Sequence, residues 1–212
     1  VMDKAAGSDL AAFRDVNVAG TRRLAQQAAD SGVRRFVYLS SIKVNGEGTA
    51  PGRPYRAADR PAPVDAYGVS KLEAEQALQE VSLASGMEFV IVRPPLVYGP
   101  GVRANFAALV RLVRRGVPLP FGAIDNRRSL VALDNLVDLL VRCLDAPQAR
   151  NHVLLVSDGQ DLSTPELIRG IAAAAGVPAR LFPMPPAALR WLGALAGRRA
   201  AMDRLCGNLQ VD

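Results

Sequence analysis

Two patterns of apolar residues alternate along this chain of 212 residues. In one pattern, apolar side chains recur at helical spacing with polar residues between them, which predicts amphipathic helices. In the other, short runs rich in Val, Ile, Leu and Phe are bounded by Gly, Pro or polar residues, which predicts buried strands. Helices are expected at residues 9–30, 66–85, 104–115, 134–144, 164–175 and 187–195, and strands at 33–39, 87–92, 129–133 and 151–156.

The order of these elements predicts an α/β fold. Helix, strand, helix and strand follow one another with short joints, which favours right-handed crossovers and a parallel sheet. After Gly101 the pattern changes to more scattered helices and extended pieces, so we expect a second lobe there. Residues 1–8 are expected to be an exposed lead-in, with Ser8 or Asp9 capping the first helix, and Asp134 or Asn135 is expected near the cap of the helix at 134–144.

Three separate segments are expected to meet at one edge of the predicted sheet. Ser40 and Ser41 follow the strand at 33–39, and residues 94–97 follow the strand at 87–92. In parallel sheets ligands bind beyond the carboxyl ends of the strands. The helix at 66–85 begins near the same edge, after a Gly and Pro-rich loop that is too long to be a mere connection. These segments therefore predict a functional crevice.

Tyr67 and Lys71 stand four residues apart at the start of this helix, so they share one helix face. A nearby ammonium group favours the phenolate form and lowers the pKa of a tyrosine. Such a pair can accept and donate a proton near neutral pH. The alternative interpretation is a buried tyrosine beside a solvated lysine, because the spacing alone is a weak signal.

Composition excludes several classes of function. The net charge is +6 and nearly all the cations are Arg, which fits either an anionic ligand or a general compositional bias. Aromatic residues are few and no nucleic-acid-binding motif is present, so no nucleic-acid partner is expected. The single histidine and two cysteines lack metal-ligand spacing, so we expect no metal site and a cytoplasmic location. The chain lacks an apolar run long enough to span a membrane.

An ordered set of motifs resembles the extended short-chain dehydrogenase/reductases. Within that family the chain looks most like bacterial nucleotide-sugar epimerases, dehydratases and 4-keto reductases. The motifs occur in family order over nearly the whole chain, and they are Asn17-Val-Ala-Gly-Thr21, Phe36-Val-Tyr-Leu-Ser-Ser41, Tyr67-x-x-Ser-Lys71, Arg93-Pro-Pro-Leu-Val-Tyr-Gly-Pro100 and Arg128-Ser-Leu-Val-Ala-Leu-Asp134.

This resemblance implies roles for residues around the predicted crevice. Ser41, Tyr67 and Lys71 would be catalytic: Ser41 bonds the reacting oxygen, Tyr67 is its general acid and base, and Lys71 lowers the pKa of Tyr67. Lys71 would also hold the nicotinamide ribose of NAD or NADP. Further cofactor contacts are implied for Ser40, Tyr67, Pro94 and Val97, and Asn17 would lie below the substrate.

In the second lobe, the resemblance implies three contacts with a nucleotide-sugar. Asn105 would contact the diphosphate, Phe121 would stack on the uracil, and Arg128 would bind the diphosphate with its planar fork of donors. The alternatives are a helix surface for Asn105, a core position for Phe121 and a solvated face for Arg128.

The chain also departs from the family pattern. The Gly-rich turn that holds the cofactor pyrophosphate at a helix N-terminus is absent, so we expect a partial chain. Residues 1–101 would be the C-terminal part of a Rossmann-type dinucleotide-binding domain. Residues 102–212 would be a smaller substrate-binding lobe, with about 129–157 returning to the Rossmann domain.

The resemblance implies hydride chemistry at C4 of a UDP-hexose, most simply a nucleotide-sugar 4-epimerase. A UDP-4-keto-6-deoxy-sugar reductase is the alternative, and a dehydratase is disfavoured because Ile42 and Lys43 follow Ser41 where an acidic pair is usual. An alternative of another class is a nucleotide-binding relative without catalysis, or a fragment that is inactive alone. A homodimer through the helices at 9–30 and 66–85 is implied for the full-length protein.

Overall fold

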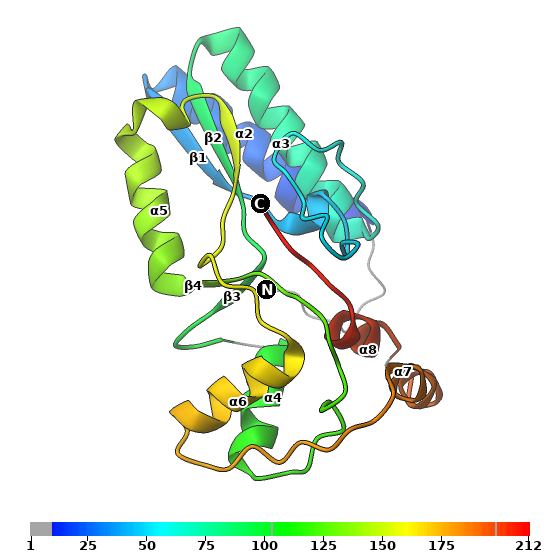
Figure 1. The fold of residues 1–212 in the computed structure, drawn as a ribbon. Coiled ribbons are helices and arrows are strands. Elements are labelled where there is room, and N and C mark those ends of the chain that lie inside the picture. Colours follow the sequence, from blue (N-terminus) through cyan, green and yellow to red (C-terminus); the bar gives the residue numbers. More distant parts are fainter. Residues whose placement is uncertain (1–9, 103, 198) are drawn as a thin grey trace.

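Parallel strands covered by helices form the core of the protein, as the computed structural model of residues 10–102, 104–197 and 199–212 shows (Figure 1). The α/β class expected from the sequence is confirmed. The expected lead-in at residues 1–8 and the capping of the first helix by Ser8 or Asp9 lie outside the described residues.

The first helical stretch contains a π-helical segment. α1 (Leu10–Phe13) continues into the π-helical η1 (Arg14–Ala19) and then into α2 (Gly20–Asp30). The N–H of Gly20 bonds to the carbonyl oxygen of Asp15, so this turn holds one residue more than an α-helical turn. The helix expected at 9–30 is therefore continuous over its described part. Its hydrogen-bond register shifts by one residue within η1.

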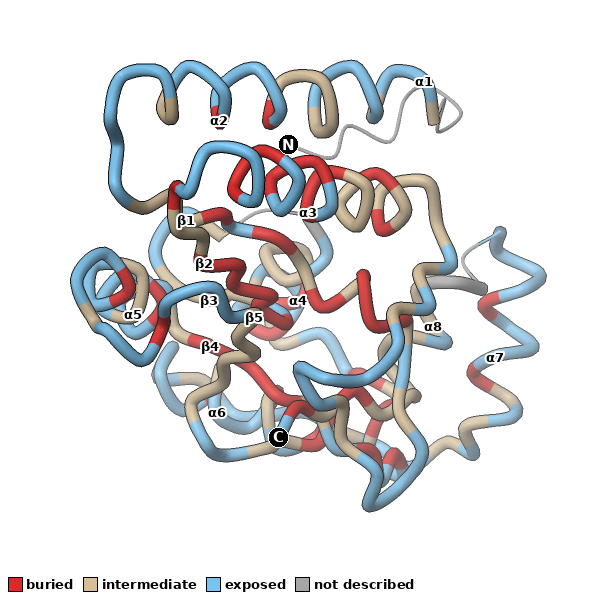
Figure 2. Tube along the Cα trace, turned by 90° about the horizontal axis from the view of Figure 1, so that it is seen from above, coloured by how far each residue is buried: buried red, intermediate tan, exposed pale blue. Residues whose placement is uncertain are grey.

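Three parallel strands form the main sheet in the order β1 (Arg35–Leu39), β2 (Glu88–Arg93) and β5 (His152–Leu155). Two helical layers enclose it, with α2 and α3 (Ala66–Ser85) on one face and α5 (Leu133–Asp145) on the other (Figure 2). Successive side chains of a strand point to opposite faces. Accordingly, Ile91 packs with Leu78 of α3, whereas Val90 packs with Leu136 of α5.

The second half of the chain builds a lobe below this sheet in Figure 1. β3 (Leu96–Tyr98) pairs in parallel with β4 (Leu130–Ala132), and the lobe has its own apolar core around Leu109, Phe121 and Ile168. After the lobe, the chain returns to the main sheet, where β5 pairs with β2. The division into two domains between residues 101 and 102 stays a prediction. The helices of this half, apart from α5, are α4 (Ala104–Arg114), α6 (Thr164–Ala174), α7 (Pro186–Leu195) and α8 (Arg199–Cys206); short 3₁₀ turns lie at η2 (Ile42–Val44) and η3 (Pro147–Ala149).

Local capping explains where α3 ends and where α6 begins. Gly86 adopts a left-handed conformation with φ 76° and ends α3, as a C-terminal glycine should. Ser163 and Glu166 form a capping box at the start of α6. Asp134 and Asn135 lie near the start of α5, as expected, but its N-cap residue Ala132 makes no side-chain cap. Asp158, which follows β5, accepts instead from the N–H of Ala132 and from the Asn135 amide.

The last residues of the chain fold back onto the long loop that follows β1. Leu209 and Val211 are buried and pack with Ile42. The N–H of Tyr55 donates to the carbonyl oxygen of Gln210 at 2.9 Å. The N–H of Ser129 donates to the carbonyl oxygen of Leu209 at 2.8 Å. This tail therefore joins the loop to the second lobe.

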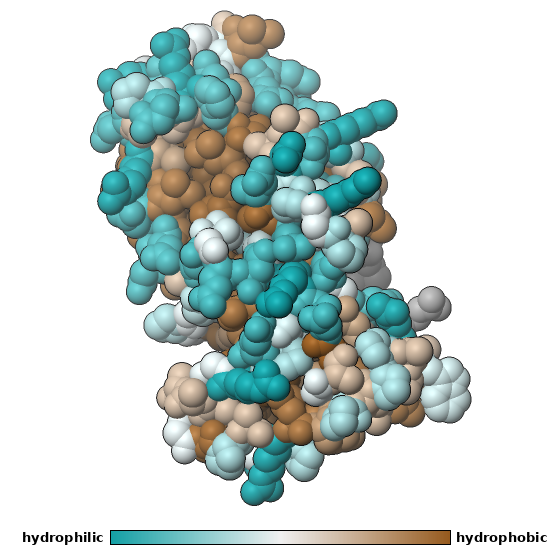
Figure 3. All heavy atoms as spheres, viewed as in Figure 1, coloured by the Kyte–Doolittle hydropathy of each residue, from teal (hydrophilic) through white to brown (hydrophobic). Residues whose placement is uncertain are grey.

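The surface view shows apolar side chains gathered over β5, between α5 and α3 (Figure 3). The sheet order places β1 and β5 at its two ends, so each has an edge that pairs with no strand within the described residues. Among the helices described here, none has both the length and the apolar character needed to cross a bilayer.

A buried ion pair joins the sheet to α3. Nε and Nη2 of Arg93 donate to the two carboxylate oxygens of Glu75 at 2.9 and 2.6 Å, and the two residues are 4% and 2% exposed. Nη1 of Arg93 donates to Oδ1 of Asn45 at 3.0 Å, and the hydroxyl of Ser40 donates to Glu75. Both charges are thus paired and hydrogen-bonded, which a buried ion pair requires.

We expect Glu75→Gln to lower the free energy of unfolding by about 3–5 kcal/mol, because it leaves the charge of Arg93 buried without a counter-ion. Urea denaturation of the full-length protein and of the variant measures this change. Asp138→Asn is the matched control, because Asp138 pairs with Arg142 at the exposed face of α5, and its cost should be below about 1 kcal/mol. Similar losses in the two variants would contradict the importance of the buried pair.

Candidate active site

Tyr67 lies at the first turn of α3, where the Pro-rich loop becomes helical. The carboxylate of Asp65 caps this helix by accepting from the N–H of Gly68 at 2.7 Å. The Tyr67 ring is half-buried, and it meets the ring of Phe13 edge-on with their centroids 5.9 Å apart. The ring is therefore held from the α1 side, at the end of α3 nearest the carboxyl ends of β1 and β2.

Asn17 supports the same turn through a relay of hydrogen bonds. Its amide donates to Oγ of Ser70 at 2.9 Å, and the Ser70 hydroxyl donates to the carbonyl oxygen of Tyr67 at 2.8 Å. The register of the π-helical segment brings Asn17 to this position. The structure thus places Asn17 beneath the Tyr67 turn, and its contact with substrate stays a prediction.

Lys71 reaches the carboxyl end of β1. Its Nζ donates to the hydroxyl of Tyr38 at 3.1 Å and to the carbonyl oxygen of Leu39 at 3.0 Å. The same ammonium group lies over the Tyr38 ring, 4.6 Å from its centroid. Burial lowers the pKa of Lys71, while the charge of Glu75 opposes this change. Burial also raises the pKa of Tyr38 to about 12, so Tyr38 remains a neutral phenol.

The expected electrostatic effect of Lys71 on Tyr67 stays a prediction, because the contacts of Lys71 in this structure are with Tyr38 and Leu39. Burial raises the pKa of Tyr67 above its usual value, because the phenolate is poorly solvated there. The cation that lowers the pKa of Tyr67 is Lys43, and Asp65 raises it. Lys71 is instead directed toward Tyr38 and Leu39, so the four-residue spacing predicted a shared face but not a shared contact.

Ser41 and Ser40 have different surroundings, although they are neighbours. Ser41 caps η2: its Oγ accepts from the N–H of Lys43 at 3.3 Å, and its side chain is partly exposed. Ser40 is buried and donates its hydroxyl to Glu75. This favours a structural role for the Ser40 side chain, and its contact with a cofactor stays a prediction.

Pro94 and Val97 lie beside the Ser41 turn and in β3. The carbonyl oxygen of Pro94 accepts from the N–H of Ile42 at 3.0 Å, which joins the end of β2 to η2. Pro94 is buried, whereas Val97 is partly buried and packs against the core under α5. The segments that follow β1 and β2 therefore meet the start of α3, as the sequence predicted, and cofactor contacts of Pro94 and Val97 stay predictions.

The three residues predicted to bind a nucleotide are placed differently from one another in the second lobe. Asn105 is exposed at the start of α4. Phe121 is 7% exposed and belongs to the apolar core of the lobe, which favours the core interpretation over stacking. Nη1 of Arg128 donates to the carbonyl oxygens of Arg204 and Gly207 at 2.6 and 3.0 Å. Burial lowers the pKa of Arg128, and its contact with a diphosphate stays a prediction.

Three residues that hold this site together, Glu75, Asn45 and Lys43, were not predicted from the sequence. Glu75 follows Lys71 by four positions and Tyr67 by eight, so the helix period could have placed it on the same face. Asn45 and Lys43 carry no comparable signal, because their partners Arg93 and Asp65 are distant in sequence. Within the described residues, no group of His, Cys, Asp and Glu side chains forms a candidate metal site.

Relatives of this chain include a well-matched curated protein. The UDP-glucose 4-epimerase of Vibrio cholerae is 54% identical over 213 residues, which cover 100% of this chain and 65% of the relative. The chain thus spans less than two thirds of the length of that relative.

Solved structures match the fold at lower identity. The UDP-glucuronic acid 4-epimerase of Bacillus cereus, in complex with NAD, has a TM-score of 0.72 at 22% identity, over 84% of this chain and 60% of that one. RMD of Pseudomonas aeruginosa, complexed with NADPH, has a TM-score of 0.73 at 23% identity, over 96% and 66% of the two chains. These similarities show a shared Rossmann-like arrangement of a parallel sheet flanked by helices.

The family itself follows from the sequence profile that covers most of the chain. The profile of the NAD dependent epimerase/dehydratase family matches residues 3–156, which include Ser41, Tyr67 and Lys71. This agrees with the resemblance found in the motifs. The chain therefore belongs to the NAD dependent epimerase/dehydratase family.

Proposed function

We propose that the full-length protein interconverts the C4 epimers of a UDP-hexose with NAD as its cofactor. The observation that supports this proposal is that Lys71 reaches the end of β1, while the turn after Ser41 bonds to the end of β2 and packs against the first turn of α3, which carries Tyr67. The similarity to the UDP-glucose 4-epimerase of Vibrio cholerae supports the choice of substrate and reaction.

The residues at this edge fit a nicotinamide nucleotide. An ammonium group carries three N–H donors, and Lys71 directs two of them to Tyr38 and Leu39. A ribose hydroxyl would accept from the third. Pro94 and Val97 would offer an apolar surface to the nicotinamide ring. When bound there, the nicotinamide would supply the hydride transfer at C4.

Tyr67 and Ser41 would manage the proton and the oxygen at C4. Tyr67 takes the proton of the 4-hydroxyl as C4 is oxidised to a ketone, and it gives the proton back when C4 is reduced. Oγ of Ser41 accepts from the N–H of Lys43, so its own hydroxyl proton can bond to the reacting oxygen. Both side chains would act on the same oxygen atom. Tyr67 would transfer its proton as general acid and base, and Ser41 would hold the oxygen by a hydrogen bond.

A UDP-4-keto-6-deoxy-sugar reductase is the second candidate, and one observation favours it. The raised pKa of Tyr67 keeps the phenol protonated at neutral pH, which suits donation of a proton to a ketone. The structure of RMD, which carries NADPH, supports a reduced cofactor for such a reaction in this fold. A nucleotide-binding protein without catalysis is the candidate from another class, and it gives no reason for the chain to carry Ser41, Tyr67 and Lys71 together.

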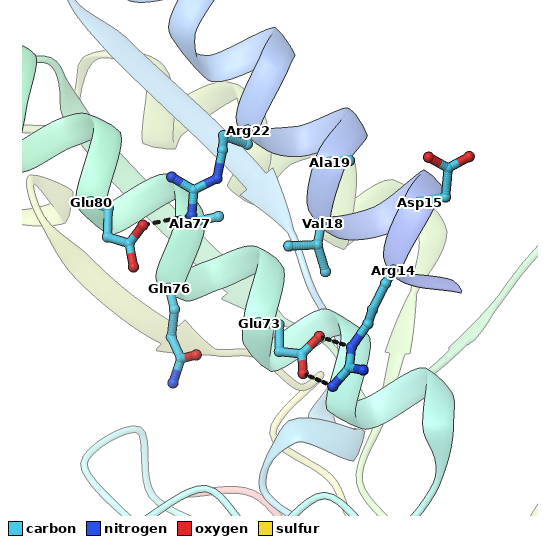
Figure 4. Close-up of a pocket in the computed structure, with 9 residues that line it drawn as sticks. All are labelled: Arg14, Asp15, Val18, Ala19, Arg22, Glu73, Gln76, Ala77 and Glu80. Carbon is cyan, nitrogen blue, oxygen red and sulfur yellow. Dashed lines mark hydrogen bonds and ion pairs between the residues drawn. The ribbon is translucent and has the colours of Figure 1, made fainter. Parts of the chain in front are cut away.

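We also propose a homodimer through the outer faces of η1, α2 and α3. Figure 4 shows the groove between these helices, which the ion pairs Arg14–Glu73 and Arg22–Glu80 bridge. Along this face Val16 is 72% exposed and Leu83, seven residues after Gln76 of the groove, is 89% exposed. Apolar side chains this exposed favour burial against a second copy. A cytoplasmic location stays a prediction, supported by the free thiols of Cys143 and Cys206.

Sedimentation of the full-length protein tests the dimer. We expect twice the monomer mass for the parent and a shift toward monomer for Leu83→Glu, because the substitution places a charge in an apolar interface. Leu195→Glu on α7 is the matched control, since Leu195 is also exposed but lies in the second lobe. A monomeric parent, or equal effects of the two substitutions, would rule out this interface.

Product chromatography tests the proposed reaction. The full-length protein is incubated with UDP-glucose, UDP-N-acetylglucosamine and a UDP-4-keto-6-deoxy sugar, each with NAD or NADPH. We expect interconversion of the 4-epimers without net use of cofactor, and a loss of about 10²–10⁴-fold in Tyr67→Phe, the usual size of a general acid and base contribution.

Tyr55→Phe is the matched control for this experiment, because the Tyr55 hydroxyl bonds to the carbonyl oxygen of Gly48 within the loop. It should retain the activity of the parent. Consumption of NADPH with the keto sugar alone would establish the reductase instead. Turnover that is unchanged in Tyr67→Phe would remove Tyr67 from the mechanism, and no turnover of any substrate would favour the binding protein.

A further inference from the structure

Lys43 occupies the turn that carries Ser41, and it is held by acidic groups on both sides. Its Nζ donates to Oε1 of Glu47 at 2.7 Å and to Oδ2 of Asp65. The side chain is only 18% exposed. Burial lowers the pKa of Lys43, but the two carboxylates outweigh this effect and leave the pKa raised. Lys43 is therefore a fixed cation at neutral pH, with both carboxylates as its partners.

Asp65 connects this cation to the helix that carries Tyr67. Its Oδ1 caps α3 through the N–H of Gly68, while Oδ2 accepts from Lys43. Burial raises the pKa of Asp65, but the bonds from Lys43 and Gly68 outweigh it and leave the pKa lowered. One ionised carboxylate thus joins the start of α3, two residues before Tyr67, to the turn that follows Ser41.

Backbone packing shows that the two segments are in direct contact. A Cβ atom at Gly68 would lie 2.8 Å from the carbonyl oxygen of Lys43, so a larger residue has no room there. On the other side of the turn, the N–H of Ile42 bonds to the carbonyl oxygen of Pro94 at 3.0 Å. The Ser41 turn is therefore held between the end of β2 and the first turn of α3.

The charges that face Tyr67 come from several elements. Lys43 faces it from η2, Asp65 from the loop before α3, and the Tyr38 phenol from β1, while Phe13 adds an uncharged ring from α1. Lys43 is the group among them that favours the phenolate form. Removal of Lys43 would leave Asp65 and Glu47 close together without their shared cation, and like charges repel.

We propose that Lys43 is a positioning residue of the active site, which pins the Ser41 turn to the first turn of α3 through Asp65. This inference rests on the proposed function, because it assumes that Ser41 and Tyr67 act on the same oxygen atom. The pairing would set the separation of these two side chains, because Asp65 holds Lys43 and caps α3 at the same time.

Steady-state kinetics of the full-length protein test the positioning role. We expect Lys43→Met to lower kcat by about ten- to a hundredfold, since small misplacements of catalytic groups have effects of this size. KM for the UDP-sugar should change little, because the nucleotide is expected to bind in the second lobe. Lys43→Arg should recover most of the lost activity, as it can keep both ion pairs.

A double-mutant comparison separates the pair from the single residue. Asp65→Asn retains an oxygen that can cap α3 but loses the charge that holds Lys43. The double variant Lys43→Met/Asp65→Asn should be no slower than Lys43→Met, because contacting residues that act as one unit are not additive. Arg142→Met is the matched control: it removes an exposed ion pair with Asp138 and should leave kcat unchanged.

A titration of Tyr67 gives a readout that needs no turnover. Difference ultraviolet absorbance between each protein and its Tyr67→Phe counterpart isolates the ionisation of this phenol. Because Lys43 lowers the pKa of Tyr67, we expect the titration to move to higher pH in Lys43→Met and to return in Lys43→Arg. If the parent turns over no UDP-sugar, the proposed function fails, and this titration still decides on Lys43.

Three results would overturn the proposal. These are an unchanged kcat and Tyr67 titration in Lys43→Met, a loss that Lys43→Arg does not recover, and additive losses in the double variant. A loss of activity that only follows the fraction of folded protein, measured by thermal unfolding, would also assign Lys43 a purely structural role.

Discussion

The buried ion pair between Arg93 and Glu75 is the interaction on which the rest of the site depends. Two charges that are buried away from water are stable only when each is fully paired. The pair therefore fixes the position of the end of β2, which carries Arg93, relative to the middle of α3, which carries Glu75. Ser40 joins the pair from the end of β1. Because Glu75 shares a helix face with Tyr67 and Lys71, this anchor also sets the rotation of α3 about its axis.

Elements that depend on local chemistry could be predicted from the sequence. The start of α3 after a Pro-rich loop, its end at Gly86 and the buried strand around Ile91 all follow from neighbouring residues. The meeting of the Ser41 turn with the start of α3 followed from a topological rule about parallel strands. Such features need only the order of residues along the chain, which is why their prediction succeeded.

Features that depend on distant partners could not be predicted in the same way. Asp158, which follows another strand, accepts from the N–H of Ala132 just before α5, and Lys71 bonds to the end of β1 instead of approaching Tyr67. Phe121 fits a core position and a stacking position equally well by its chemistry, and only the packing of the lobe distinguishes them. In each case the deciding neighbour lies far away in sequence, and no periodicity or spacing rule identifies it.

The π-helical segment η1 holds one residue more per turn than the α-helix around it. An α-helix turns by about 100° per residue, so the extra residue rotates everything before it relative to α2. That rotation is what brings Phe13 to the Tyr67 ring while Asn17 reaches Ser70. A deletion of a single residue in η1 would restore a regular helix and turn Phe13 away from the Tyr67 ring. The alignment of the reactive phenol thus depends on a residue count in a helix that supplies none of its proposed catalytic groups.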